Sequence, residues 1–426
     1  MLFKAALAVF MRGLAACAIF AFNFVVAKRL DPVASGYFLW AFSGVVIFLQ
    51  VGLMGFHDVA LKHIARSVGS GKDSEAWSIS GLIFSRVLLA FIIVSSLLLL
   101  LSEKIAHAIF PESREVVLVV RLMVPGLAFN GMSHLLSFQL QGAGKPAKAI
   151  FSLSIGHYAL FCAILILSGT HSPVMASAIY SFASLINTLL AFVWWRNAIP
   201  SKTRVPVDRR ELWSMAMPLW AIALMSVIVN WGGQLISGIW VSAEEISHYA
   251  VAMRAVALIN FILLAMNFVV APRIAQLHAA HDIQGLQSFI TTVTRFLYSI
   301  AIPVAACVIL FSDQVMGIFG SEFSRSGRIL LVLAVGQIIN VLTGPVSHLL
   351  TMTGNERSFR NVYVLSSALC LLLTYALTKR LGILGTAVAT SLAISLQNGL
   401  AAYMVRKKLG ISISPFRSTS ATDDVR

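Results

Sequence analysis

Long apolar stretches alternate along the chain with short polar connections. A helix needs roughly 20 mostly apolar residues to cross the hydrocarbon core of a bilayer. Twelve stretches of this kind occur, with approximate limits 5–27, 37–56, 79–101, 115–140, 149–169, 173–195, 213–240, 246–271, 289–311, 326–352, 360–378 and 383–405. The pattern therefore predicts an all-α membrane protein with about twelve transmembrane helices.

Composition supports this prediction and excludes a water-soluble protein. Of the 426 residues, 58% are hydrophobic and 12% are charged, whereas soluble domains carry about 25% charged residues. The connections are too short to hold a sizeable soluble domain, and a short polar tail follows Arg406. The net charge of +15 is then better explained by basic loops on one membrane side than by nucleic-acid binding.

The distribution of basic residues predicts the orientation. With twelve spans, both termini and every even-numbered connection share one side. By our assignment that side carries nineteen of the 32 lysines and arginines, and the opposite side carries eight. Cytoplasmic loops are enriched in these residues, so we expect both termini and the connection 196–212, which includes Lys202, to be cytoplasmic.

Five arginines remain, and all fall inside predicted spans, whereas all 17 acidic residues lie in loops or at span edges. A charged side chain near the bilayer centre is costly, so such arginines either face a wet or anionic cavity or extend to the interface. Guanidinium groups fit phosphate and carboxylate in a bidentate manner. The five are Arg12, Arg86, Arg121, Arg254 and Arg295.

The two halves of the chain resemble each other at a spacing near 210 residues. Gly126, Asn130 and Gly144 recur as Gly336, Asn340 and Gly354, Ser85-Arg86 as Thr294-Arg295, and residues 31–37 as 243–249. Six helices per repeat is an even number, which predicts parallel repeats related by an axis along the membrane normal. We expect six-helix lobes at 1–200 and 201–410, a cytoplasmic tail at 411–426, and a substrate path between the lobes.

Four segments resemble polysaccharide-biosynthesis flippases of the Wzx type, in the multidrug/oligosaccharidyl-lipid/polysaccharide exporter superfamily. They are 29–37 (RLDPVASGY), 141–146 (QGAGKP), 242–252 (SAEEISHYAVA) and 272–275 (PRIA). The resemblance implies a V-shaped, MATE-like bundle of two lobes. It also implies transport of an undecaprenyl-diphosphate-linked oligosaccharide across the bacterial inner membrane, for lipopolysaccharide O-antigen or exopolysaccharide. The peptidoglycan lipid flippases of this superfamily typically have fourteen helices, which argues against that branch.

For the substrate site we select Arg12 and Arg254, together with the matching pair Arg86 and Arg295, as cationic groups for an anionic lipid-linked sugar. Snorkelling to the interface stays open for Arg86 and Arg295 and is favoured for Arg121. The expected partners are the lipid-linked oligosaccharide, the membrane, a polysaccharide polymerase and chain-length proteins. We expect no nucleic acid, cofactor, metal or catalytic residues, and no enzyme activity, because no phosphate-binding loop or catalytic constellation occurs.

Two alternative functions remain open. A drug/ion antiporter of the same superfamily would use an intramembrane carboxylate, and the nearest candidate is Asp58, which we interpret as a solvated pair with His57. A membrane-embedded polymerase or glycosyltransferase would need a larger outer loop than the chain offers. Three histidines within spans could bind protons or form structural hydrogen bonds. They are His134, His157 and His348.

Further residues in the spans fit structural roles. Four prolines could be hinges or static bends, and the tryptophans at span ends fit an aromatic belt. The four cysteines are best explained as small packing residues. The prolines are Pro125, Pro218, Pro303 and Pro345, and the tryptophans are Trp194, Trp195 and Trp213.

Overall fold

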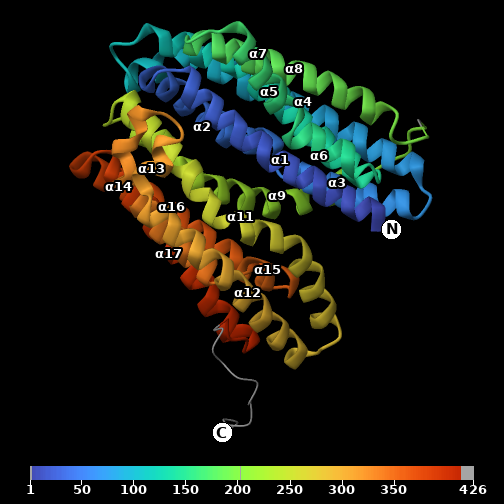
Figure 1. Cartoon of the computed structure of the whole chain (residues 1–426). Coiled ribbons are helices and arrows are strands. Elements are labelled where there is room, and N and C mark those ends of the chain that lie inside the picture. Colours follow the sequence, from blue (N-terminus) through green and yellow to red (C-terminus); the bar gives the residue numbers. More distant parts are fainter. Residues whose placement is uncertain (1, 202, 414–426) are drawn as a thin grey trace. The chain divides into compact units, whose positions relative to one another are not determined.

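The computed structural model describes residues 2–201 and 203–413, with the side chains of 2–9 and of several positions in 261–272 left aside. Lys202 and the predicted tail from residue 414 onward lie outside the described residues. Every regular element of the described chain is a helix (Figure 1). The helices are α1 (Leu2–Arg29), α2 (Pro32–Leu53), α3 (Phe56–Gly69), α4 (Asp73–Ile109), α5 (Arg114–Gly142), α6 (Pro146–Ser154), α7 (Gly156–Ser168), α8 (Pro173–Arg196), α9 (Arg209–Val227), η1 (Ile228–Gly232), α10 (Gly233–Ser237), α11 (Ala243–Ala279), α12 (Ile283–Leu310), α13 (Ser312–Gly317), η2 (Ser321–Ser326), α14 (Gly327–Leu342), α15 (Val346–Met352), α16 (Glu356–Leu381) and α17 (Ile383–Leu409).

The predicted fold class, an all-α membrane protein, is confirmed. The described residues contain ten helices that are long and apolar enough to cross a membrane, and eleven if the bent pair α6–α7 is one span. Twelve were predicted. The predicted span 246–271 is not in this count, and it lies within α11, where some side chains are not described.

Helix starts follow from local capping chemistry. Asp31 caps α2 by accepting a hydrogen bond from the Ala34 amide at 2.8 Å, and Pro32 occupies the first turn. Asp208 caps α9 and Asp282 caps α12 in the same manner. Aspartate satisfies amides that have no partner within the helix, and proline at the first position has no such amide to lose. The cap at Asp31 places the start of α2 before the predicted limit of residue 37.

The contacts divide the chain into two compact units, Met1–Ser247 and His248–Arg426. In the first unit α5 packs on α2, α3, α4, α6 and α8. Asn187 of α8 donates hydrogen bonds to Ser133 Oγ of α5 at 2.7 Å and to the Ser152 carbonyl of α6 at 2.8 Å. Without water in the membrane, such polar contacts and close van der Waals packing hold helices together.

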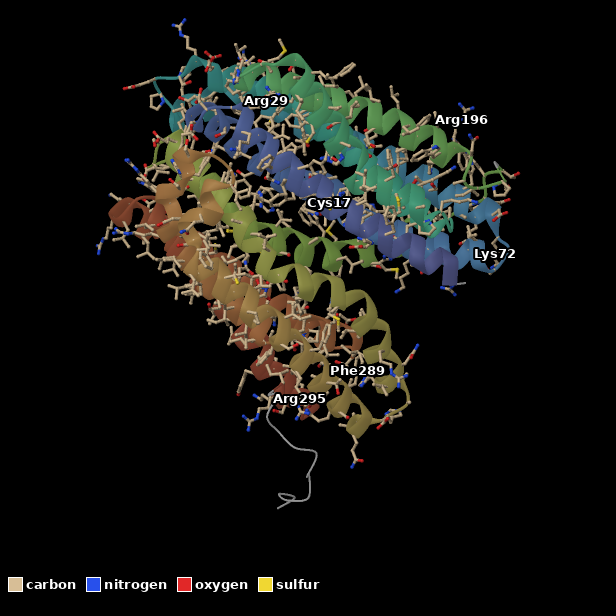
Figure 2. All side chains as sticks on the ribbon, in the orientation of Figure 1. Cys17, Arg29, Lys72, Arg196, Phe289 and Arg295 are labelled. Carbon is tan, nitrogen blue, oxygen red and sulfur yellow. The ribbon has the colours of Figure 1, made fainter. Side chains whose placement is uncertain are left out.

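The seventh predicted span begins with α9, and in this structure it packs with the first unit. α9 contacts α2 and α3, and Trp220 Nε1 donates to the Gln50 carbonyl at 2.8 Å. Lys72 and Arg196 lie at one end of the first unit and Arg29 lies at the other (Figure 2). This arrangement is the one that the predicted order of spans requires. The predicted lobe boundary after residue 200 stays a prediction.

In the second unit α14 packs on α12 and α17, and α16 packs on α17. Tyr249 of α11 is fully buried, and its hydroxyl lies 2.8 Å from Thr390 Oγ1 of α17. Thr378 of α16 and Thr386 of α17 share a hydrogen bond of 2.8 Å. Hydroxyl pairs of this kind let polar side chains occupy the interior of an apolar bundle.

Helices break inside two predicted spans and at the end of a third. Met54 and Gly55 separate α2 from α3 with φ of 46° and 74°. The pair α6–α7 bends by 41° at Ile155. Pro345 lies between α14 and α15 next to Gly344, whose φ is 67°. The other three span prolines, Pro125, Pro218 and Pro303, lie inside continuous helices.

Candidate functional site

The four arginines predicted to bind substrate are distributed over both units. Arg12 lies on α1 and Arg86 on α4, in the first unit, and both are half-buried. In the second unit Arg254 of α11 is half-buried, whereas Arg295 of α12 is exposed (Figure 2). Their convergence on one cleft stays a prediction.

The fifth arginine, Arg121, has an acidic partner that the sequence did not indicate. Its Nη2 lies 3.2 Å from Glu103 Oε2, and its Nε donates to Ser102 Oγ at 3.0 Å. The Arg121 side chain is 46% exposed. The pairing was missed because α4 continues to Ile109, beyond the predicted end at residue 101, so Glu103 is helical and faces α5.

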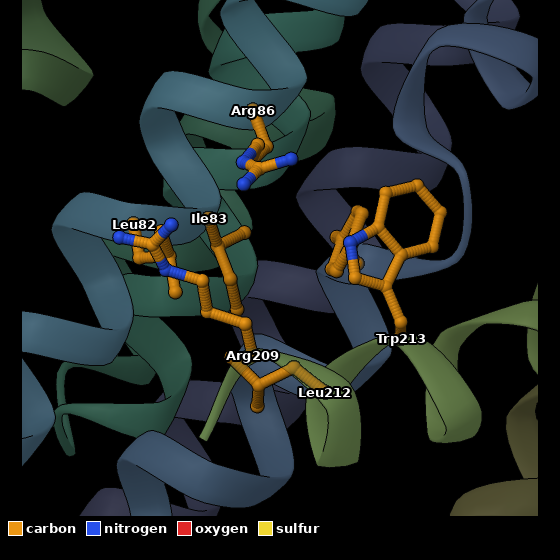
Figure 3. Close-up of a pocket in the computed structure, with 7 residues that line it drawn as sticks. Leu82, Ile83, Arg86, Arg209, Leu212 and Trp213 are labelled. Atoms are coloured by element: carbon orange, nitrogen blue, oxygen red, sulfur yellow. The ribbon is translucent and has the colours of Figure 1, made fainter. Parts of the chain in front are cut away.

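Arg86 contributes to a small pocket between three helices of the first unit (Figure 3). It comes from α4 with Leu82 and Ile83, while Phe56 comes from α3. The start of α9 supplies Arg209, Leu212 and Trp213. Figure 3 shows the guanidinium groups of Arg86 and Arg209 on either side of Ile83. The sequence paired Arg86 with Arg295 and gave no indication of Arg209.

A larger groove of about 510 Å³ adjoins this pocket and shares Leu82 and Arg209 with it. It lies between the start of α4, the end of α8 and the connection 197–208. Its walls are Trp77, Ser78, Gly81, Leu82, Phe84, Ser85, Trp195, Arg204, Val205, Pro206, Val207 and Arg209. No aspartate or glutamate is among the residues that line either cavity.

Hydrogen bonds hold the connection 197–208 against α4. Ser74 Oγ and Ser201 Oγ lie 2.8 Å apart, and the Val205 amide donates to Ser78 Oγ at 2.8 Å. Trp195 also lines the groove. It stacks on Trp77 with ring centroids 5.1 Å apart, and its Nε1 donates to Ser80 Oγ at 2.6 Å. Trp195 therefore has a structural role beyond the predicted aromatic belt.

A third cavity of the first unit, about 260 Å³ in volume, is apolar. It lies between α2, α4, α5 and α10, and its walls include Trp40, Phe48, Leu98, Met123 and Leu235. Trp40 Nε1 donates to the Leu235 carbonyl at 2.9 Å. An apolar lining suits a hydrocarbon chain and offers nothing to a sugar or a phosphate.

Only one member of the predicted solvated pair is buried: the Asp58 side chain is 39% exposed, whereas His57 lies in the interior. His57 is 4% exposed, its Nε2 lies 3.4 Å from Asp58 Oδ2, and its ring meets that of His134 at 5.4 Å between centroids. His157 is also buried, at 2% exposure. The positions of these histidines can be read from the sequence, but only the break between α2 and α3 brings His57 against His134 of α5.

The second unit contains an amide cluster that the sequence did not reveal. Asn260 of α11 donates to Gln337 of α14, and Asn340 donates to Asn260 Oδ1 at 3.0 Å and to Gln337 Oε1 at 3.2 Å. Asn340 had been noticed only as a repeat marker. Within the described residues, no group of three or more histidine, cysteine or acidic side chains is placed to hold a metal ion.

Two family models match the chain. The model described as polysaccharide biosynthesis protein matches residues 3–278, and the MatE model matches residues 221–376. The chain is 24% identical over 251 residues to the probable low-salt glycan biosynthesis flippase Agl15 of Haloferax volcanii, covering 58% of this chain and 52% of the relative. It is 25% identical over 195 residues to the probable flippase AglR of the same organism, covering 45% and 41%. The chain thus spans about half the length of these curated relatives.

Solved structures with similar folds belong to the superfamily suggested by the four motifs. An inward-facing multidrug resistance MATE family transporter matches with a TM-score of 0.77 and 14% identity over 93% of this chain and 94% of that one. The lipid II flippase MurJ matches with a TM-score of 0.73 and 16% identity over 95% and 88%. At such low identities these likenesses establish the fold, and with the family models they confirm the predicted resemblance.

Proposed function

Because the chain belongs to the polysaccharide biosynthesis protein family, we propose that it is a flippase that moves a lipid-linked oligosaccharide across a membrane. The observation that carries the proposal is the match of that family model over residues 3–278. The relatives named as flippases support it, one of them in glycan biosynthesis. Apolar helices that contain arginines but few acids suit an anionic cargo.

The finer proposal gives the cargo an undecaprenyl diphosphate carrier and places the protein in the bacterial inner membrane with both termini in the cytoplasm. The head group and sugars cross between two lobes by alternating access, while the polyprenyl tail stays in the lipid. Arg12 and Arg254 hold phosphate or acidic sugar groups through bidentate hydrogen bonds. A polysaccharide polymerase and chain-length proteins act on the product, which enters O-antigen or exopolysaccharide.

Deletion of the gene tests the class of function. We expect loss of a surface polysaccharide and accumulation of its lipid-linked unit on the cytoplasmic leaflet. Normal polymer together with raised sensitivity to cationic drugs would instead support the antiporter. Lipid-linked units delivered to the outer leaflet but left unpolymerised would point to a membrane-embedded polymerase.

Arg12 and Arg254 test the mechanism in the complemented deletion strain. Arg→Ala removes charge-assisted hydrogen bonds worth about 1.5–3 kcal/mol each, or about ten- to a hundredfold in affinity. Lysine should restore transport partly, because it keeps the charge but loses the planar fork, and glutamate should be worse than alanine. The measurement is polymer yield, corrected for protein level in the membrane.

Arg121→Ala is the matched control, because Arg121 is also an arginine in an apolar helix but is exposed and paired with Glu103. Exposed ion pairs contribute little to stability, so this variant should support wild-type polymer yield. If Arg12→Ala and Arg254→Ala support as much polymer as Arg121→Ala does, the cationic-cavity mechanism is wrong.

A further inference from the structure

The groove beside Arg86 lies where the lipid-facing surface of α4 begins. Large apolar side chains are exposed on α4 from Leu88 onward, at Leu88, Leu89, Ile92, Ile93, Leu97 and Leu100. In the preceding turns the apolar side chains are buried or half-buried, and the polar residues include Asp73, Ser74, Glu75 and Ser78. An exposed apolar face ends at the hydrocarbon boundary, and lipid phosphates lie immediately outside it. Arg86 therefore stands at phosphate level.

α8 supports the same position for the boundary. Its exposed apolar side chains include Phe182, Leu189 and Val193, and the helix ends at Arg196, one residue after the groove residue Trp195. Two neighbouring walls of the groove thus pass from apolar to polar at the same end of the first unit. Tryptophan is enriched at this depth because its ring is apolar and its N–H is polar.

The charge of the groove is positive and fixed. Arg204 and Arg209 line it, Arg86 lines the adjoining pocket beside Arg209, and no carboxylate lines either cavity. The nearby carboxylate of Asp208 is engaged in capping α9. Arginine stays protonated at any physiological pH and presents a fork of donors that fits phosphate.

The groove is also a built structure. The bonds from Ser74 to Ser201 and from Val205 to Ser78 hold the connection 197–208 in place, and the stacked rings of Trp77 and Trp195 form another part of the lining. Trp195 is in turn anchored through Ser80, which donates to Gln139 Oε1 at 2.8 Å. A wall held in place before binding loses little conformational freedom when a ligand enters.

We propose that this groove binds the phosphate head group of one anionic phospholipid of the surrounding membrane. Arg86, Arg204 and Arg209 hold the phosphate, and the acyl chains run along the exposed face of α4 beyond Leu88. The proposal assigns Arg86 to a membrane lipid in place of the transported substrate. It does not depend on the proposed transport function, since the binding is measured without transport.

The full-length protein, purified in detergent, is incubated with phosphatidylglycerol or with phosphatidylcholine and examined by native mass spectrometry. We expect one phosphatidylglycerol to be retained tightly and phosphatidylcholine to be retained at least tenfold more weakly. The double variant Arg86→Gln, Arg209→Gln should lower phosphatidylglycerol affinity by about tenfold or more, because each lost charge-assisted bond costs about that factor. Arg121→Gln, which removes an arginine elsewhere on the first unit, should bind as wild type does.

Three results would overturn the proposal. The first is equal retention of phosphatidylglycerol by the double variant and Arg121→Gln. The second is displacement of the lipid by millimolar inorganic phosphate, which would make the site one for free anions. The third is tighter retention of a polyprenyl diphosphate than of phosphatidylglycerol, which would assign the groove to the cargo. If the double variant does not fold, the exposed single variant Arg204→Gln replaces it and should weaken retention in the same direction.

Discussion

α5 in the first unit and α14–α15 in the second occupy matching positions in the sequence repeat, and they agree at some points and differ at others. Gly126 and Gly336 both pack closely against a neighbouring helix. A Cβ added at Gly126 would lie 2.6 Å from Ser181 Oγ, and one added at Gly336 would lie 2.8 Å from Ser391 Oγ. Gly144 and Gly354 share a left-handed backbone, with φ of 74° and 76°. Both copies of the repeat therefore have a close helix–helix contact at the first glycine and a left-handed turn at the second.

The two segments differ in their polar contacts and in continuity. Asn130 donates to the Tyr180 hydroxyl at 2.8 Å, whereas Asn340 joins the amide cluster with Asn260 and Gln337. α5 runs through Pro125 unbroken, but its counterpart stops at Leu342 and resumes at Val346. The two copies of the repeat therefore share the close helix contacts and the glycine turns. They differ in the polar contacts inside each unit and in the continuity of the helix.

Alanine substitutions at Gly126 and Gly336 should give the largest difference in stability between the two copies. At Gly336 the added Cβ would also lie 2.9 Å from Ser391 Cα and 3.0 Å from its carbonyl oxygen, and backbone atoms cannot turn aside. At Gly126 the obstacles are side chains of Tyr180 and Ser181. We expect Gly336→Ala to lower the free energy of unfolding by about 3 kcal/mol and Gly126→Ala by about 1 kcal/mol. Thermal midpoints in detergent measure both, and a larger loss at Gly126 would contradict the expected order.

Leucine at the two asparagines should give an intermediate difference. Asn340→Leu removes two hydrogen bonds and leaves Asn260 Oδ1 without that donor, so we expect a loss of about 1–2 kcal/mol. Asn130→Leu removes one bond, to Tyr180, and should cost about half as much. Thermal midpoints again provide the measurement. Equal losses would mean that the amide cluster adds nothing beyond one pair.

Alanine at the two turn glycines should give equal and small effects. Neither Gly144 nor Gly354 has an atom within 4 Å of an added Cβ, so only the left-handed backbone opposes the substitution. That costs about 1 kcal/mol at each site. Unequal shifts of the thermal midpoint would show that one of the two turns carries strain beyond its own φ.

The sequence predicts the spans well because the membrane imposes a strong length and polarity requirement on each of them. It fails at the breaks. A single glycine marks each of them, Gly156 after Ile155 and Gly55 between α2 and α3, and single glycines such as Gly126 also occur inside continuous helices. The start of α3 was missed for the same reason, and with it the burial of His57.

The candidate sites show the same limit. Positions of arginines can be read from the sequence, but their partners come from helices that meet in space. Arg121 pairs with Glu103 because α4 continues beyond the end of its predicted apolar span, as far as Ile109. Arg86 and Arg209 line the same pocket because hydrogen bonds hold the connection 197–208 along α4. That connection has no apolar periodicity, so nothing in its pattern predicts its path.

The hydrogen bond from the Val205 amide to Ser78 Oγ also affects how readily a protease cleaves the connection 197–208. Trypsin cleaves after arginine only where the backbone around the bond can unfold locally and extend in its active site. The bond after Arg204 ends in the Val205 amide, which is held by Ser78 Oγ. Cleavage there requires that hydrogen bond to open first, so the rate at which trypsin divides the chain at Arg204 reports how often the wall of the groove detaches from α4.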